Sequence, residues 1–202
     1  MPNDLQQLYG NIDIYLFDQL LKGRFNNCHT VLDAGCGSGR NLHYFLQNGY
    51  NVHAIDADAH AINFVQQLSA DLSSTVPATN FSVAGVDQLP YSDNFFDLVI
   101  SSAVLHFAQD HNHFDAMLRS MWRVLKPGGY LFARLASDIG IEDLVAPLGN
   151  GRYVLPDGST RYLVDQEVLL EYTRSLGGEL VEPIKTTNVQ NSRCMTTWCL
   201  RK

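Results

Sequence analysis

Long apolar runs are missing from this sequence, and none reaches the roughly 20 residues that a helix needs to cross a bilayer. The first four residues, MPND, do not begin a basic segment followed by an apolar one, as an export signal would. Positive charge is scarce, with 14 lysines and arginines against 21 acidic residues and a net charge of −7, which disfavours a broad surface for phosphate backbones. We expect a cytoplasmic monomer or homodimer that acts on a small molecule and binds neither nucleic acid nor membranes.

Cysteine is also rare, and its four positions, 28, 36, 194 and 199, form no C-x-x-C pair. Cys36 lies inside a glycine-rich turn where a disulfide would be awkward, so we interpret all four residues as reduced thiols. The 202 residues, 46% of them hydrophobic, suffice for one well-buried core and are too few for two large domains. We expect a single domain over residues 1–202.

The most informative segment present is residues 31–41, VLDAGCGSGRN, in which an apolar strand runs into a predicted helix start. It contains one acid and three alternating glycines: Asp33, Gly35, Gly37 and Gly39. Glycine adopts positive φ and lets a ligand approach the main chain. The dinucleotide fingerprint G-x-G-x-x-G would need a glycine where Arg40 stands, and Asp33 would repel a pyrophosphate. The same carboxylate suits a ligand with an ammonium and a sulfonium, such as S-adenosylmethionine (SAM).

Further segments follow the glycine turn at regular intervals: residues 51–56 (NVHAID), 83–90 (VAGVDQLP), 96–106 (FDLVISSAVLH) and 125–131 (LKPGGYL). Together with the turn they resemble class I SAM-dependent methyltransferases over nearly the whole chain. Residues 39–41, Gly-Arg-Asn, are similar in a weaker way to tellurite-resistance-type methyltransferases, which are thought to methylate small oxyanions or other soft nucleophiles. The resemblance implies SAM as cofactor and S-adenosylhomocysteine as product.

In this family, the acid after the second strand takes the ribose diol and the acid after the third meets the adenine amino group. The matching positions are Asp56 and Asp87. Aspartate is also a preferred helix cap, so each acid has an ordinary structural alternative. The cofactor-binding residues that we expect are Tyr9, Tyr15, Asp33, Gly35, Cys36, Gly37, Gly39, Arg40, Asp56, Ala57, Val86, Asp87, Gln88 and Ser102.

Strand and helix patterns alternate from residue 29 onward, which is typical of a parallel sheet covered on both faces. We expect an α/β fold: a doubly wound, seven-stranded, mostly parallel sheet with an antiparallel C-terminal hairpin strand and helices on both faces. The expected strands are 29–35, 51–56, 79–85, 96–102, 129–136, 180–189 and 194–200, and the main helices are 39–48, 58–72, 111–125 and 165–176. The short link 190–193 permits only an antiparallel hairpin. That hairpin argues against an NAD-dependent oxidoreductase.

Two segments lie outside this core. The apolar spacing of residues 4–22 predicts a helix with a break near Gly10, and the resemblance implies that residues 1–28 form a lid over the cofactor. Tyr9 and Tyr15 would face the sulfonium with aromatic surface. The other segment, residues 137–163, is an insertion on the carboxyl side of the sheet, where doubly wound folds bind ligands. We expect it to shape the acceptor pocket.

Within the insertion, Asp157-Gly158 predicts a two-residue type I′ hairpin that pairs Val154 with Arg161. One face then carries Arg152 and Arg161. If that face meets the pocket, it suits an anionic acceptor; if it faces solvent, the arginines are merely hydrated and the tyrosine face packs on the core. The acceptor-binding residues that we expect are Arg134, Arg152, Tyr153 and Arg161.

Methyl transfer is an in-line displacement, so the protein has mainly to align the two reactants in a dry site. His106, just beyond the fourth strand, is the candidate general base, and its alternative role is packing against the lid or orienting water. With Asp110, His111 and His113 it lacks a tight metal-ligand spacing, so we expect a solvated helix start and no metal. The alternative function is a SAM-binding regulatory module without catalysis.

Overall fold

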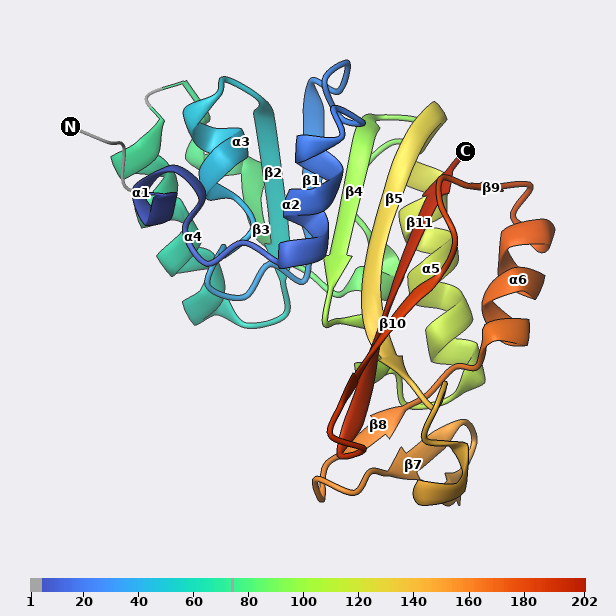
Figure 1. Cartoon of the computed structure of the whole chain (residues 1–202). Helices are drawn as coiled ribbons and strands as arrows, with labels where there is room; N and C mark the ends of the chain where they lie inside the picture. Colours follow the sequence, from blue (N-terminus) through green and yellow to red (C-terminus); the bar gives the residue numbers. More distant parts are fainter. Residues whose placement is uncertain (1–4, 74) are drawn as a thin grey trace.

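The computed structural model describes residues 5–73 and 75–202 and is built on one large sheet. Its main strands are β1 (Thr30–Ala34), β2 (Asn51–Asp56), β3 (Phe81–Val83), β4 (Phe96–Ser102), β5 (Leu125–Ser137), β10 (Lys185–Val189) and β11 (Arg193–Arg201). They lie in the order β10-β11-β5-β4-β1-β2-β3 (Figure 1). Strands β1 to β5 pair in parallel, whereas β11 is antiparallel to both β5 and β10. The predicted doubly wound, mostly parallel sheet with an antiparallel C-terminal hairpin is confirmed.

The strand expected over residues 180–189 is wrong in one respect, because the structure divides it. A short strand, β9 (Glu179–Leu180), pairs antiparallel with β11 and makes the sheet eight-stranded, and β10 begins only at Lys185. Pro183 lies between the two strands, and proline has no N–H to donate to a ladder.

Helices cover both faces of the sheet. Their bounds are α1 (Leu5–Tyr9), α2 (Ile14–Leu21), α3 (His43–Gln47), α4 (Ala59–Leu72), α5 (His111–Val124) and α6 (Gln166–Ser175), with single 3-10 turns η1 (Ala78–Asn80), η2 (Val86–Gln88), η3 (Leu105–Phe107) and η4 (Glu142–Leu144). Successive residues of β1 point to opposite faces, so Val31 is buried with Leu16 of α2, and Leu32 with Phe114 of α5. No helix in the described part of the chain is long and apolar enough to cross a membrane.

Of two further helix predictions, one differs from the structure and one agrees with it. Of the helix expected over residues 39–48, only α3 forms. Positive φ at Gly37 and Gly39 keeps the chain before α3 in turns. The leading segment does break at Gly10, whose φ is +57°, into α1 and α2. Of the expected lid, residues 1–4 lie outside the described residues.

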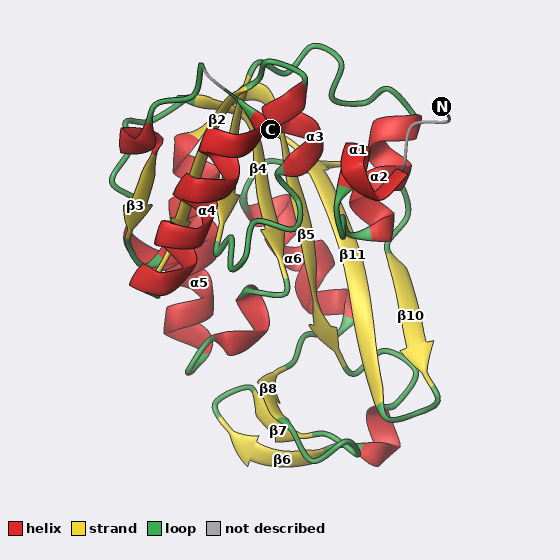
Figure 2. Ribbon diagram, turned by 90° about the vertical axis from the view of Figure 1, so that its left-hand side faces the viewer, coloured by secondary structure: helices red, strands yellow, loops and turns green. Residues whose placement is uncertain are grey.

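The insertion forms a separate antiparallel sheet of β6 (Ala146–Gly149), β7 (Arg152–Val154) and β8 (Thr160–Tyr162), placed beyond the ends of β5 and β11 (Figure 2). The predicted register is wrong by one residue: Val154 pairs with Thr160, and Tyr153 with Arg161. The reason is the turn, in which Gly158 N–H donates to Leu155 C=O at 2.9 Å and only Gly158, of the central residues, has positive φ. Pro156 favours this three-residue loop, because its fixed φ suits the start of a type I turn.

One buried histidine in the sheet has no polar partner. His53 of β2 packs its ring edge-to-face on Tyr91, Phe95 and Phe96, at centroid distances of 5.6, 5.5 and 5.3 Å. Among the described residues neither ring nitrogen finds a hydrogen-bond partner. Burial lowers the pKa of His53 to about 4, so the folded protein holds this ring neutral.

Acid should therefore destabilise the fold through His53. Between about pH 6.5 and pH 4 the unfolded chain binds a proton at this residue that the folded chain does not. This one site should lower the free energy of unfolding by up to about 1.4 kcal/mol per pH unit. In His53→Leu that part of the pH dependence should vanish, as measured by urea unfolding at pH 7 and pH 5. The control is His60→Leu on the exposed side of α4; an equal acid sensitivity in both variants would contradict the assignment.

Candidate functional site

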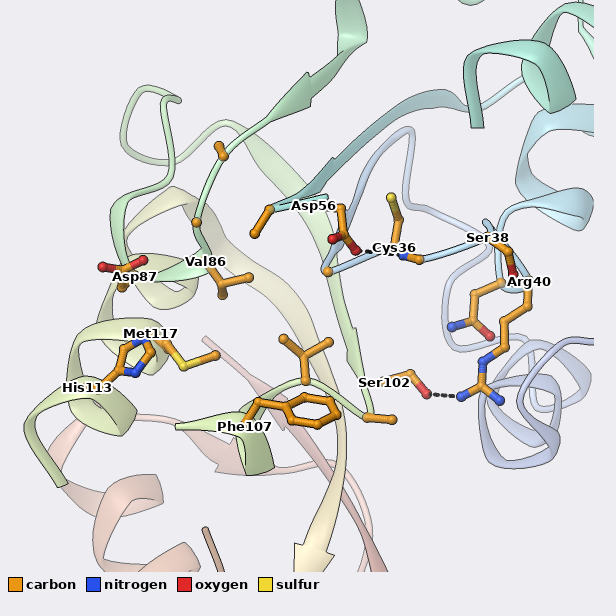
Figure 3. Close-up of a pocket in the computed structure, with 18 residues that line it drawn as sticks. Cys36, Ser38, Arg40, Asp56, Val86, Asp87, Ser102, Phe107, His113 and Met117 are labelled. Carbon is orange, nitrogen blue, oxygen red and sulfur yellow. Dashed lines mark hydrogen bonds between the residues drawn. The ribbon is translucent and has the colours of Figure 1, made fainter. Parts of the chain in front are cut away.

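A cavity of about 650 Å³ opens where β1, β2 and β4 end, at the carboxyl edge of the sheet. Figure 3 shows Cys36, Ser38 and Arg40 at one end of it and Asp87, His113 and Met117 at the other. Its lining comes from the glycine turn after β1, the end of β2, the segment around η2, the end of β4 with η3, and the first half of α5. Segments far apart in the chain thus meet at the edge where doubly wound sheets bind ligands.

The three glycines of the turn serve different purposes. A Cβ on Gly35 would come within 2.5 Å of the Val104 side chain, so this position needs glycine for packing. Gly37, at φ +51°, lines the cavity, and a Cβ there would meet nothing within 4 Å. Gly39 lies behind the turn, where a Cβ would come within 3.0 Å of Val65 on α4. Only Gly35 and Gly37 therefore face the space where a ligand would lie.

Asp56, the last residue of β2, holds the turn in shape. Its Oδ2 accepts the Gly37 N–H at 2.8 Å, and its Oδ1 accepts the Asp58 N–H at 2.9 Å. The carboxylate also lines the cavity, where hydroxyl groups of a ligand would find an acceptor.

Asp33 is the most perturbed acid at the site. It is buried behind the glycine turn, and its Oδ2 has no hydrogen-bond partner among the described residues. Burial raises its pKa to about 7, an effect that the Arg40 charge opposes and the Asp56 charge reinforces. An unpartnered buried carboxylate next to the cavity is what a cationic ligand group would satisfy.

The other end of the cavity has Val86 and Met117 near Asp87, and Phe107 lies lower in the view, between this end and Ser102 (Figure 3). Asp87 lies in η2 and is the polar group there that could meet an adenine amino group. Sequence reasoning missed Phe107, His113 and Met117. The last two stand four residues apart on α5, and that spacing places them on one helix face.

Nine of the fourteen expected cofactor residues line this cavity: Gly35, Cys36, Gly37, Arg40, Asp56, Ala57, Val86, Asp87 and Ser102. Five do not: Tyr9, Tyr15, Asp33, Gly39 and Gln88. Gln88 lines a separate hollow beside Arg119 of α5. Tyr9 stacks on Tyr44, 5.8 Å between centroids, and so contacts α3.

A buried ion-pair network joins the lid to the sheet through Asp13, the N-cap of α2, which sequence reasoning also missed. Its Oδ2 accepts from Arg134 Nη1 at 2.8 Å and from Ser102 Oγ at 3.2 Å, and lies 3.5 Å from Arg40 Nη2. Arg40 also donates to Ser102 Oγ at 2.8 Å (Figure 3). Tyr15, next in the lid, lies under the Arg134 guanidinium at 5.1 Å. An aspartate just before an apolar helix is an N-cap signal that was available in the sequence.

A second cavity, of about 360 Å³, adjoins the first and shares Arg40, Ala103 and Phe107 with it. It extends toward the insertion, and its polar lining includes Arg134 and Arg161 from the expected acceptor set. The other two members of that set lie elsewhere. Tyr153 lines a different hollow beside α6, and Arg152 lines neither of the adjoining cavities. The shifted hairpin register separates Arg152 from Arg161, because Arg161 is paired with Tyr153.

His106 lines this second cavity, and its ring accepts a hydrogen bond from the main chain. Its Nδ1 accepts the Ala136 N–H at 3.1 Å, so the neutral ring carries its proton on Nε2. Burial, with a smaller effect of the Arg161 charge, lowers its pKa to about 4. This geometry argues against the expected role as general base, because the free nitrogen already bears a proton.

The neighbouring histidines and Asp110 form the start of α5. Asp110 Oδ1 accepts the His113 N–H at 2.8 Å as N-cap, and His111 Nδ1 is 2.8 Å from the Tyr162 hydroxyl. Within residues 5–73 and 75–202, no three His, Cys, Asp or Glu side chains are grouped closely enough to hold a metal ion.

A family model described as "Methyltransferase domain" matches residues 32–133, which are 102 of the 202 residues. O-methyltransferase 3 of Dictyostelium discoideum is 28% identical over 182 residues, covering 82% of this chain and 40% of that protein. The malonyl-[acyl-carrier protein] O-methyltransferase of Enterobacter lignolyticus is 34% identical over 109 residues, covering 54% and 39%. The chain thus spans about two-fifths of the length of these curated relatives.

Two solved structures share the fold. A SAM-dependent methyltransferase of Methanosarcina mazei is 19% identical with a TM-score of 0.68, covering 91% of this chain and 96% of that one. The 1,6-didemethyltoxoflavin-N1-methyltransferase of Burkholderia thailandensis, solved with 1,6-didemethyltoxoflavin and S-adenosylhomocysteine, is 20% identical with a TM-score of 0.69, covering 98% and 81%. The chain therefore belongs to the methyltransferase domain family, and the predicted family is confirmed. The narrower tellurite-type resemblance stays a prediction.

Substitution of Gly37 should remove cofactor binding and leave the fold intact. In Gly37→Val the new side chain would stand in the open space that the cavity offers. Calorimetric titration with S-adenosylhomocysteine should give no measurable binding, while thermal unfolding stays cooperative. Gly49→Val is the control, because Gly49 also has positive φ and open space around a Cβ but lies outside the cavity. Normal affinity in Gly37→Val would mean that the ligand does not approach this turn.

The raised pKa of Asp33 predicts a pH-dependent affinity. The ligand's ammonium should favour the ionised carboxylate, so binding below pH 7 must release a proton from Asp33. The association constant for S-adenosylhomocysteine should rise up to about tenfold per pH unit below pH 7 and level off above it. In Asp33→Asn the affinity should be lower at pH 7.5 and nearly flat between pH 5.5 and 7.5. Equal wild-type affinities at those two pH values would exclude this pairing.

Proposed function

We propose that this chain transfers a methyl group from SAM to a small-molecule acceptor. The observation that carries the proposal is that the two cavities adjoin: the one at the glycine turn and the second share Arg40, Ala103 and Phe107 in their linings. One space suits the cofactor and the adjoining one suits the acceptor. The two reactants would meet at the boundary between the cavities, beside these three shared residues.

The first cavity, together with Asp33 buried behind its glycine turn, fits SAM in three places. The unpartnered Oδ2 of Asp33 would take the ammonium, the carboxylate of Asp56 the ribose hydroxyls, and Asp87 the adenine amino group. The open space over Gly37 would admit the amino-acid part of the ligand. When bound, SAM supplies an electrophilic methyl carbon on its sulfonium.

The chain itself would align the reactants and exclude water. Asp13 ties the lid to Arg40 and Arg134, and this closes the side of the site that faces α2. Phe107 forms an apolar wall common to both spaces. An in-line displacement at the methyl carbon needs no covalent bond to a protein residue. It also needs no general base when the acceptor atom is already unprotonated, and His106 is not placed to act as one.

The ribose assignment can be tested with Asp56→Ala. Loss of this acceptor should weaken S-adenosylhomocysteine binding by about 1–3 kcal/mol, because a ligand donor and the Gly37 N–H lose their partner. Calorimetry measures the affinity. Asp58→Ala is the matched control: it removes the neighbouring carboxylate, which caps α4 and lies outside the cavity. An unchanged affinity in Asp56→Ala would refute the assignment.

Methyl transfer itself is tested by release of S-adenosylhomocysteine from SAM in the presence of pooled small-molecule acceptors. Binding of the cofactor together with acceptor-dependent release would support the enzyme. Binding without turnover of any pool would instead favour the regulatory module.

A further inference from the structure

We infer that the acceptor at this site is a carboxylic acid with an apolar body, methylated on a carboxylate oxygen. The inference rests on the proposed function and concerns the second cavity. Three features of that cavity support it: its charge, its lack of a base, and its apolar wall.

Positive charge gathers around the second cavity, against the net charge of −7 of the whole chain. Four arginines line it: Arg40, Arg134, Arg161 and Arg193. Two carboxylates face them. Asp13 is shared by Arg40 and Arg134, and Asp157 lies 3.9 Å from Arg193. Four guanidinium groups against two carboxylates leave a net excess of two positive charges, and of the four arginines only Arg161 has no ion-pair partner among the described residues. An anionic ligand would balance this charge.

Arg161 is the arginine best placed to receive that ligand. Its guanidinium lies 5.0 Å from the centroid of Phe107, the ring that both cavities share. Stacking on an aromatic ring fixes the plane of the guanidinium and leaves its edge for a carboxylate. Nη1 donates to the Thr160 carbonyl at 2.7 Å, and no carboxylate in the described part of the chain lies within ion-pair distance of Arg161.

Among the described residues that line this cavity, no group is set to remove a proton from an acceptor. The Nδ1 atom of His106 is engaged by the Ala136 N–H. Asp157 accepts from the Ser159 N–H and Oγ, which with the nearby Arg193 lower its pKa and make it a weak base. Asp13 is occupied by two arginines and Ser102. The nucleophile must therefore carry a free lone pair at neutral pH, as a carboxylate does.

The remaining walls are apolar, with Phe107, Leu155 and Met195 among them. They favour an acid whose body is aliphatic or aromatic over a small inorganic oxyanion. The transfer balances without a proton. A lone pair of the carboxylate oxygen forms the new O–CH₃ bond, the C–S bond breaks, and its electron pair stays on sulfur. The products are a neutral methyl ester and a neutral thioether.

The test compares monocarboxylic acids of increasing apolar length, aliphatic and aromatic, with their primary amides. Each is titrated into the protein saturated with S-adenosylhomocysteine, and each is then offered with SAM to measure S-adenosylhomocysteine release. We expect at least one acid to bind ten times more tightly than its amide and to be methylated. In Arg161→Gln/Arg193→Gln that acid should lose at least tenfold in affinity, while S-adenosylhomocysteine binds as before.

The control is Arg119→Gln/Arg174→Gln, which removes the same two charges from α5 and α6 and should keep the preference for acids. Acids that bind no better than their amides, or a preference that survives in Arg161→Gln/Arg193→Gln, would overturn the carboxylate inference and leave the proposed function standing. Failure of the wild-type protein to bind S-adenosylhomocysteine would instead overturn the proposed function, and the inference with it.

Discussion

The buried carboxylate of Asp13 is the interaction on which the site depends most. It lies where α2, the glycine turn, β4 and β5 converge, and it accepts from Arg40, Ser102 and Arg134 at once. The lid and the floor of the site are therefore one polar unit, and neither can rearrange without the other. Asp13 is fully buried, but the side chains of Arg134 and Arg40 remain 19% and 39% exposed, so solvent screens these ion pairs more than it would a fully buried pair.

Burial then sets the protonation of the groups around this unit. It raises the pKa of Asp33 and lowers the pKa of His106, so both groups are biased toward their neutral forms. A site with few free charges of its own takes much of its electrostatic character from what binds. The arginines are the exception, because guanidinium stays protonated in proteins. They keep the acceptor side positive at every physiological pH.

The sheet, its order of motifs and the C-terminal hairpin could be predicted from the sequence, because buried parallel strands and glycine turns leave local patterns. The two acids Asp56 and Asp87 were placed for the same reason, since Asp56 is the last residue of one strand and Asp87 lies shortly after the end of the next. The details that failed have two causes, a local turn in one case and contacts between distant segments in the others. The register of the 152–162 hairpin depends on Pro156 in its turn. Arg193 is distant in sequence from the insertion, and it lines the second cavity with Arg161 only in the folded chain. Asp13 had a readable N-cap signal, but its two arginine partners did not follow from it.

Phe107 has a consequence for the order of events. The ring is 57% exposed, and it forms part of both cavities. Ligands in the two spaces would contact one side chain, and this contact provides a route by which one ligand can change the affinity of the other. By reciprocity, any factor by which a bound cofactor strengthens acceptor binding must equal the factor by which the acceptor strengthens cofactor binding. A single aromatic ring would thus let the protein favour the ternary complex over either binary one, and keep the cofactor from being held tightly while it has nothing to react with.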